Sequence, residues 1–186
     1  MHIGFAMTGS FCTFGRVFPI IEDLVKEYTV VPILSPAACT VDSRFGQATD
    51  HIRRITDICG MSPLTEISQV EPIGPKKLLD ALIIAPCTGN TLAKLAHSIA
   101  DTAVTMAAKS HLRNGGPILL AVSTNDALSG AAENIGKLLG KKHYYFVPFG
   151  QDDPLEKPTS MVADFGQIPE ALHLALQGKQ IQPIIQ

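Results

Sequence analysis

Hydrophobic positions along the chain form two kinds of pattern. Short continuous apolar runs, rich in β-branched residues, predict strands buried on both faces over 2–7, 29–34, 81–85, 117–122 and 144–148. Apolar residues spaced about 3.6 positions apart predict helices from Phe14 onward and over 51–59, 92–112, 130–139 and 164–176. Pro19 lies in the opening turns of the first helix, which we expect to begin later or to bend there.

Strands and helices alternate along the whole chain, and this order predicts an α/β fold. Continuous apolar strands joined by helices indicate a single doubly wound, mainly parallel sheet with helices on both faces. A length of 186 residues suits one domain, 1–186, in which 149–186 form a C-terminal loop, helix and tail. Residues 61–75 are rich in proline and polar side chains and predict irregular structure.

Composition and charge exclude several classes of function. The net charge is −2 and no basic run is present, so we expect no nucleic-acid partner. No apolar stretch reaches the roughly 20 residues that span a bilayer, and the chain does not open on a signal-peptide pattern. We therefore expect a cytoplasmic protein without a membrane partner. The four cysteines lack C-x-x-C spacing, which argues against a metal site, but Cys12 and Cys87 fall in strand-to-helix loops where a thiol could face a ligand.

Four loops with hydroxyl, amide or small side chains follow the predicted strands. Ligands of doubly wound sheets bind beyond the carboxyl ends of the strands, and the loops there are 8–13, 35–38, 86–91 and 123–126. A helix N-cap explains Ser35 or Asp126 taken alone, but four such loops at one edge predict a ligand site. Free N–H groups at the helix that follows 86–91 favour a phosphate or another anion. Lys94 is either solvated or adds charge near that anion, and Asp101 could cap a second helix.

Several familiar motifs are absent from the sequence. No G-x-G-x-x-G follows the first strand, and 130–138 has Leu138 where a phosphate loop has Ser or Thr. There is no G-x-S-x-G, and the six histidines show no metal-ligand spacing. The residues by themselves therefore identify no catalytic group.

The segment 80–101 resembles the P-A-S-A-N-T segment of a known family, the homo-oligomeric flavin-containing cysteine decarboxylases and flavin prenyltransferases. Its central part reads Ala85-Pro-Cys-Thr-Gly-Asn-Thr-Leu-Ala-Lys-Leu-Ala96. Segment 123–128, Ser-Thr-Asn-Asp-Ala-Leu, stands where that family has P-x-M-N-x-x-M-W. Thr8-Gly-Ser10 matches the first flavin-contacting loop, and Ser35 matches the residue after the second strand. The resemblance covers roughly residues 1–148.

This resemblance implies a Rossmann-like flavoprotein fold, an FMN cofactor and assembly into a homo-oligomer. The flavin contacts that it implies are Gly9, Ser10, Ser35, Pro86, Thr88, Gly89, Asn90 and Thr91. The substrate contacts that it implies are Ser123, Thr124 and Asn125. It implies no catalytic residue for this chain, because no histidine matches the family's active-site histidine.

Departures from the family pattern point to one branch of the family. Val122, Thr124 and Ser129 replace the Pro, Met and Trp of the decarboxylase motif, and 151–161 replace its cysteine-bearing clamp. The Pro-Cys-Thr-Gly-Asn-Thr variant and the segment 157–165 resemble a branch found in spore-forming bacteria. Its members are one subunit of an oxidoreductase for a small dicarboxylate, and the partner subunit carries NAD(P). Two alternatives remain open: a noncatalytic partner without flavin, and a stand-alone FMN-dependent decarboxylase or prenyltransferase.

Overall fold

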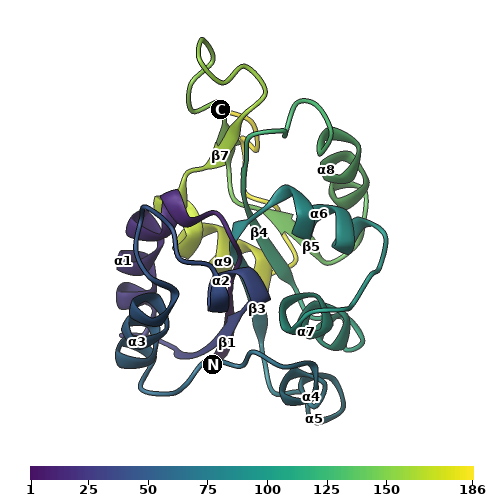
Figure 1. Ribbon diagram of the computed structural model, residues 1–186. Helices are drawn as coiled ribbons and strands as arrows, with labels where there is room; N and C mark the ends of the chain where they lie inside the picture. Colours follow the sequence, from purple (N-terminus) through teal and green to yellow (C-terminus); the bar gives the residue numbers. More distant parts are fainter.

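A mainly parallel sheet of seven strands forms the centre of the computed structural model, which describes residues 1–186 (Figure 1). The strands are β1 (His2–Met7), β2 (Thr29–Leu34), β3 (Ala81–Cys87), β4 (Ile118–Thr124), β5 (Tyr144–Phe146), β6 (Phe149–Gly150) and β7 (Met161–Ala163). Their order is β2-β1-β3-β4-β7-β6, and β5 pairs in parallel with the first half of β4. The end of β4 pairs instead with β7, which is antiparallel to both β4 and β6.

Helices cover both faces of the sheet. They are α1 (Phe14–Leu24), α2 (Pro36–Thr40), α3 (Ala48–Cys59), α4 (Ile67–Val70), α5 (Ile73–Lys76), α6 (Gly89–Ala96), α7 (Ala103–Leu112), α8 (Ala132–Leu139) and α9 (Ile168–Leu176). One face carries α1 and α9, which also contact each other, and the other face carries α6 and α7. This two-sided cover explains why all seven residues of β3 are buried. No helix combines the length and the apolar character needed to cross a membrane.

The predicted fold class is confirmed, and the first two strands have the predicted bounds. The first helix begins at Phe14 and continues through Pro19. Helix α3 begins at Ala48, three residues before the predicted helix 51–59. Strand β3 runs past its predicted end through Pro86 to Cys87. These differences lie at element ends, where hydrophobic periodicity is least informative.

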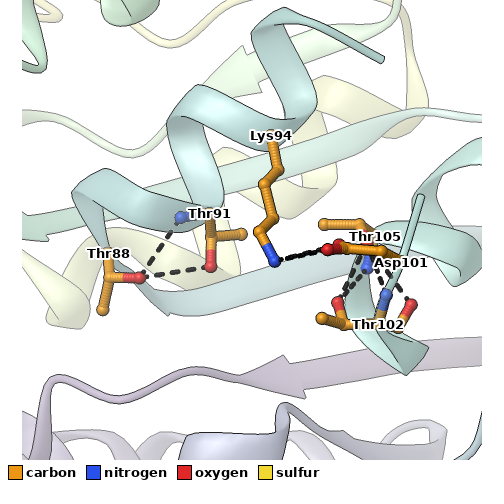
Figure 2. A network of polar contacts seen from close by, with 6 residues as sticks. All are labelled: Thr88, Thr91, Lys94, Asp101, Thr102 and Thr105. Atoms are coloured by element: carbon orange, nitrogen blue, oxygen red, sulfur yellow. Dashed lines mark hydrogen bonds and ion pairs between the residues drawn. The ribbon is translucent and has the colours of Figure 1, made fainter. Parts of the chain in front are cut away.

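The helical stretch expected over 92–112 is divided into two helices, and the second begins close to the cap expected at Asp101 (Figure 2). The first, α6, ends at Ala96, and Ser98 then takes a left-handed conformation with φ of 59°. Thr102 caps α7 by accepting a hydrogen bond from Thr105 N, and Thr105 Oγ1 accepts one from Thr102 N. The cap is therefore Thr102 and not Asp101, which accepts two hydrogen bonds of 2.9 Å from Lys94.

Two further segments contain structure that the pattern did not predict. The segment 61–75 holds α4 and most of α5, and a capping box between Glu66 and Gln69 begins α4. The C-terminal segment 149–186 holds the short strands β6 and β7 before α9. Both strands are too short, at two and three residues, to show an alternating pattern.

Candidate functional site

The carboxyl ends of β1, β2, β3 and β4 bring the four polar loops to one edge of the sheet. One hydroxyl group joins the first loop to the third. Thr8 Oγ1 donates to the Pro86 carbonyl at 2.7 Å and accepts from Thr88 N at 3.1 Å. Thr8 is almost completely buried. This side chain therefore fixes the loop after β1 against the loop after β3.

A central cavity of about 680 Å³ opens at this edge. Its volume lies within the range of small-molecule sites, about 300–1,000 Å³. Eight of the predicted site residues line it: Gly9, Ser10, Thr88, Gly89, Asn90, Ser123, Thr124 and Asn125. The structure thus brings all three predicted substrate contacts together with five of the predicted flavin contacts.

A side cavity of about 400 Å³ adjoins the central cavity. Three residues, Gly9, Thr88 and Asn90, line both cavities. The side cavity also holds the remaining predicted flavin contacts, Ser35 and Thr91, together with Lys94. Pro86 is the exception, because it is buried and lines neither of the two cavities.

Backbone N–H groups are the main donors where the two cavities meet. The N–H groups of Gly9, Gly89 and Asn90 donate no hydrogen bond within the protein. The latter two belong to the first turn of α6, where helical N–H groups have no intrahelical acceptor and the helix dipole is positive. Thr88 caps this helix by accepting a hydrogen bond of 3.4 Å from Thr91 N. The arrangement favours an anionic group.

Positive charge at the side cavity is partly neutralised. Lys94 lines the side cavity, and its ammonium group points to Asp101, as Figure 2 shows. The hydrogen bonds from Lys94 hold the pKa of Asp101 below its usual value. Ser35 caps α2 by accepting a hydrogen bond of 3.3 Å from Ala38 N, as the cap interpretation of this residue predicts. The side cavity therefore offers backbone dipoles and hydroxyl groups more than free charge.

The end of β4 and the loop after it also line the central cavity. Ser123 is buried, and its hydroxyl lies 2.8 Å from that of Ser10. Thr124 donates to the Asp126 carboxylate. A Cβ atom at Gly89 would lie 2.7 Å from Asp126 Oδ1 and 2.8 Å from Thr124 Oγ1. Glycine at this position therefore allows the loop after β4 to approach the N-terminus of α6.

The sequence missed seven residues of the central cavity: Ser43, Arg44, Phe45, Asp152, Lys157, Ser160 and Val162. They come from the turn between α2 and α3, from the segment that joins β6 to β7 and, for Val162, from β7 itself. Burial alone would raise the pKa of Asp152, but the Ser160 hydroxyl and the Lys157 ammonium lower it overall. No motif marks these loops, and neither hydrophobic periodicity nor spacing places them at the cavity.

The two thiols singled out from the sequence have different surroundings. Cys12 is exposed and lines the central cavity. The expectation that Cys87 could face a ligand is wrong, because its side chain is completely buried in β3 and burial raises the pKa of the thiol. No histidine lines either cavity, and no group of three His, Cys, Asp or Glu side chains could hold a metal ion.

Comparison of the chain with known proteins identifies the family to which it belongs. The sequence profile of the flavoprotein family matches residues 1–166. The chain belongs to the flavoprotein family. It is 44% identical over 185 residues to the B subunit of dipicolinate synthase from Bacillus subtilis, covering 99% of this chain and 92% of that protein. This confirms the branch that the Pro-Cys-Thr-Gly-Asn-Thr variant and the C-terminal segment indicate.

Solved structures of the family agree with the fold. The crystal structure of the dipicolinate synthase B subunit from Bacillus halodurans matches with a TM-score of 0.91 and 42% identity, covering 100% of this chain and 95% of that one. The FMN-dependent cysteine decarboxylase SpaF matches with a TM-score of 0.70 and 23% identity, covering 94% of this chain and 97% of SpaF. The second match shows the shared fold only, because its identity is low.

Proposed function

We propose that this chain is the B subunit of a dipicolinate synthase. It would work with an A subunit that carries NAD(P), making pyridine-2,6-dicarboxylate from a dihydrodipicolinate-level precursor in the mother cell of a sporulating bacterium. The observation that carries this proposal is 44% identity over 99% of the chain to a protein of that name. The central cavity, at about 680 Å³, is large enough for such a substrate.

FMN is the cofactor that the two cavities fit. The unpaired N–H groups of Gly89 and Asn90 suit its phosphate, and the hydroxyl groups of Ser10, Ser35 and Thr88 suit its polar chain. Phe11 and Phe45 supply apolar surface in the central cavity for an aromatic ring. Bound flavin would supply a reversible two-electron acceptor.

The overall reaction removes two electrons and two protons from the precursor. NAD(P)⁺ on the A subunit would take a hydride, and a proton would be released. This chain's own contribution is then to bind and orient the dicarboxylate. Ser123, Thr124 and Asn125 line the central cavity beside the N-terminus of α6 and are the proposed substrate contacts.

A second candidate is a noncatalytic partner that holds the A subunit in its active form without binding flavin. The lack of any histidine in either cavity favours it, because histidine is the side chain that most often transfers protons at neutral pH. The two candidates differ in cofactor content. A third, the stand-alone decarboxylase or prenyltransferase, differs in needing no A subunit.

Purification of the chain alone, followed by its visible absorption spectrum, separates these candidates. Flavin absorbance would exclude the noncatalytic partner without flavin. Dipicolinate formation, followed by its ultraviolet absorbance, should appear only after the A subunit is added. Activity of the isolated chain on a cysteine-containing peptide would contradict the proposal.

The substrate contacts can be tested in the reconstituted enzyme. Asn125 is exposed and lines the central cavity, so Asn125→Ala should raise KM for the precursor. Asn134 lies in α8 outside both cavities, and Asn134→Ala is the matched control. Equal kinetics of the two variants would show that Asn125 is not a substrate contact.

We also propose that the chain forms a homo-oligomer in addition to its complex with the A subunit. Exposed apolar side chains at Ile99, Leu128 and Leu139 support this, because such side chains are usually covered at subunit contacts. Light scattering on the purified chain should give a mass that is a multiple of 19.9 kDa. A monomeric mass at micromolar concentration would contradict it.

A further inference from the structure

Arg44 is held at the central cavity by a tight turn between α2 and α3. Ser43 N donates to the Gly46 carbonyl at 3.0 Å, and Gly46 N donates back to the Ser43 carbonyl at 3.1 Å. Phe45 N donates to Ser43 Oγ at 3.1 Å. These three hydrogen bonds fix the backbone on both sides of Arg44, whose side chain lines the cavity.

Among the charged side chains of the central cavity, Arg44 is the cation without a partner. The cavity is lined by two cations, Arg44 and Lys157, and by two carboxylates, Asp126 and Asp152. Lys157 pairs with Asp152 at 3.4 Å. Arg44 forms no ion pair, and its guanidinium donates no hydrogen bond to the protein. All five of its N–H donors are therefore free for a ligand.

An aromatic side chain keeps the guanidinium in place. The Cζ atom of Arg44 lies 4.8 Å from the centre of the Phe45 ring, a cation–π contact. Phe45 itself lines the cavity although 45% of its surface is exposed. A guanidinium supported on one face by a ring presents its N–H groups at the edge, where a carboxylate can accept two parallel hydrogen bonds.

We propose that Arg44 binds a carboxylate group of the substrate and that Phe45 is its positioning residue. This inference rests on the proposed function, since a dicarboxylate precursor brings two negative charges into the central cavity. The cavity's other cation is already paired with Asp152. The flavin phosphate has its own donors in the backbone N–H groups of Gly89 and Asn90. Arg44 is thus the cation left to recognise a carboxylate, beside the neutral contacts Ser123, Thr124 and Asn125.

Titration of the purified, flavin-containing chain with pyridine-2,6-dicarboxylate and with pyridine-2-carboxylate tests this directly. Arg44→Met should weaken dicarboxylate binding by about 10- to 100-fold, the range for a lost charged hydrogen-bonded pair. Arg44→Lys keeps the charge but loses the paired N–H donors of the guanidinium, so its dicarboxylate affinity should lie between those of wild type and Arg44→Met. Arg53→Met is the matched control, because Arg53 lies in α3, pairs with Asp50 and lines neither cavity.

The role of Phe45 is tested by the dicarboxylate affinity of two variants. Phe45→Ala should weaken dicarboxylate binding by a few-fold, since the guanidinium loses its support. Phe45→Tyr keeps the ring and should restore binding. In the reconstituted enzyme both Arg44→Met and Phe45→Ala should raise KM far more than they lower kcat.

Three binding results would overturn the assignment of Arg44. The first is equal dicarboxylate affinity of Arg44→Met and wild type, and the second is no carboxylate binding by wild type. The third is loss of FMN from Arg44→Met with unchanged carboxylate affinity, because Arg44 would then hold the cofactor. If Arg44→Met leaves the activity of the reconstituted enzyme unchanged, the assignment of Arg44 fails but the proposed function does not. Absent activity with the A subunit, together with Arg44-dependent binding of pyridine-2-carboxylate, would remove the proposed function and leave Arg44 as a carboxylate-binding residue.

Discussion

The two ends of the same sheet are built in opposite ways. At the carboxyl end, the loops after the strands leave cavities of about 680 and 400 Å³ and several N–H groups without acceptors. At the amino end, glycines allow close packing. A Cβ at Gly74 would lie 2.7 Å from the Ser110 carbonyl oxygen, and one at Gly116 would overlap the His111 ring. Asn114 adds a hydrogen bond of 2.7 Å to the Gly74 carbonyl.

This difference separates stability from binding along the length of the strands. The Gly74 carbonyl at the amino end already has a protein partner, so a change there costs packing and leaves the ligand site intact. The N–H groups of Gly9, Gly89 and Asn90 at the carboxyl end have no such partner, and a ligand can supply one. Thr8 also lies at the carboxyl end, but it satisfies two backbone groups. Variants at the two ends should therefore affect different measurements.

The largest effect is expected from Thr8→Val, which keeps the shape of the side chain but removes its hydroxyl. The Pro86 carbonyl and Thr88 N would both lose their partner. The free energy of unfolding should fall by about 1–3 kcal/mol for each group left buried without a hydrogen bond. Flavin content should fall as well, because the loops after β1 and β3 are no longer joined. Urea denaturation and the visible spectrum measure the two effects.

Thr8→Ser is the control for this variant, since it keeps the hydroxyl. It should retain flavin and most of the stability. If Thr8→Val retains flavin as well as Thr8→Ser does, the link between these two loops is not needed for binding.

A loss of stability without a loss of binding is expected from Gly74→Ala at the amino end. The added Cβ meets a backbone carbonyl, which cannot rotate away. Overpacking of this kind lowers the free energy of unfolding by about 1–3 kcal/mol. Gly136→Ala is the matched control, because a Cβ there meets nothing within 4 Å. It should stabilise α8 by about 0.5–1 kcal/mol. Altered flavin content in Gly74→Ala at low temperature would contradict the separation of the two ends.

Hydrophobic pattern predicted the sheet, because β1 to β4 are continuous apolar runs buried on both faces. It also predicted the loops at the carboxyl edge, since the topology fixes where the strands end. It could not predict the break between α6 and α7, because Leu95 and Val104 are buried on either side of it and the apolar spacing continues. It could not find Arg44 or Lys157 either. Their place at the cavity depends on how two irregular loops fold back, which neither periodicity nor spacing encodes.

A pH-dependent loss of stability is expected from the amino end. Burial lowers the pKa of His111 below 6.5, although its hydrogen bond to the Pro117 carbonyl and the charge of Asp80 oppose this. The unfolded chain therefore binds a proton before the folded chain does. Above pH 6.5 His111 is neutral in both states and does not change the free energy of unfolding. As the pH decreases from 6.5 toward the lower pKa of the folded state, the free energy of unfolding falls by at most about 1.4 kcal/mol per pH unit.

Urea denaturation between pH 7.5 and pH 5 measures this slope. Burial also lowers the pKa of His51, so wild type should show the sum of two histidines. His111→Gln removes one of them and should give a shallower slope. Equal slopes for wild type and His111→Gln would show that the His111 pKa is not lowered by folding.

The smallest effect on stability, with a clear effect on binding, is expected from Asn90→Ala at the carboxyl end. The Asn90 side chain is exposed, lines both cavities and forms no hydrogen bond within the protein. Its removal should change the free energy of unfolding by less than about 0.5 kcal/mol. Flavin content should nevertheless fall, because the amide is left free to contact the cofactor. The control Asn134→Ala should have the same free energy of unfolding as Asn90→Ala but should retain flavin. If instead Asn90→Ala unfolds at lower urea than Gly74→Ala, the carboxyl end contributes packing energy of its own, and the contrast between the two ends does not hold.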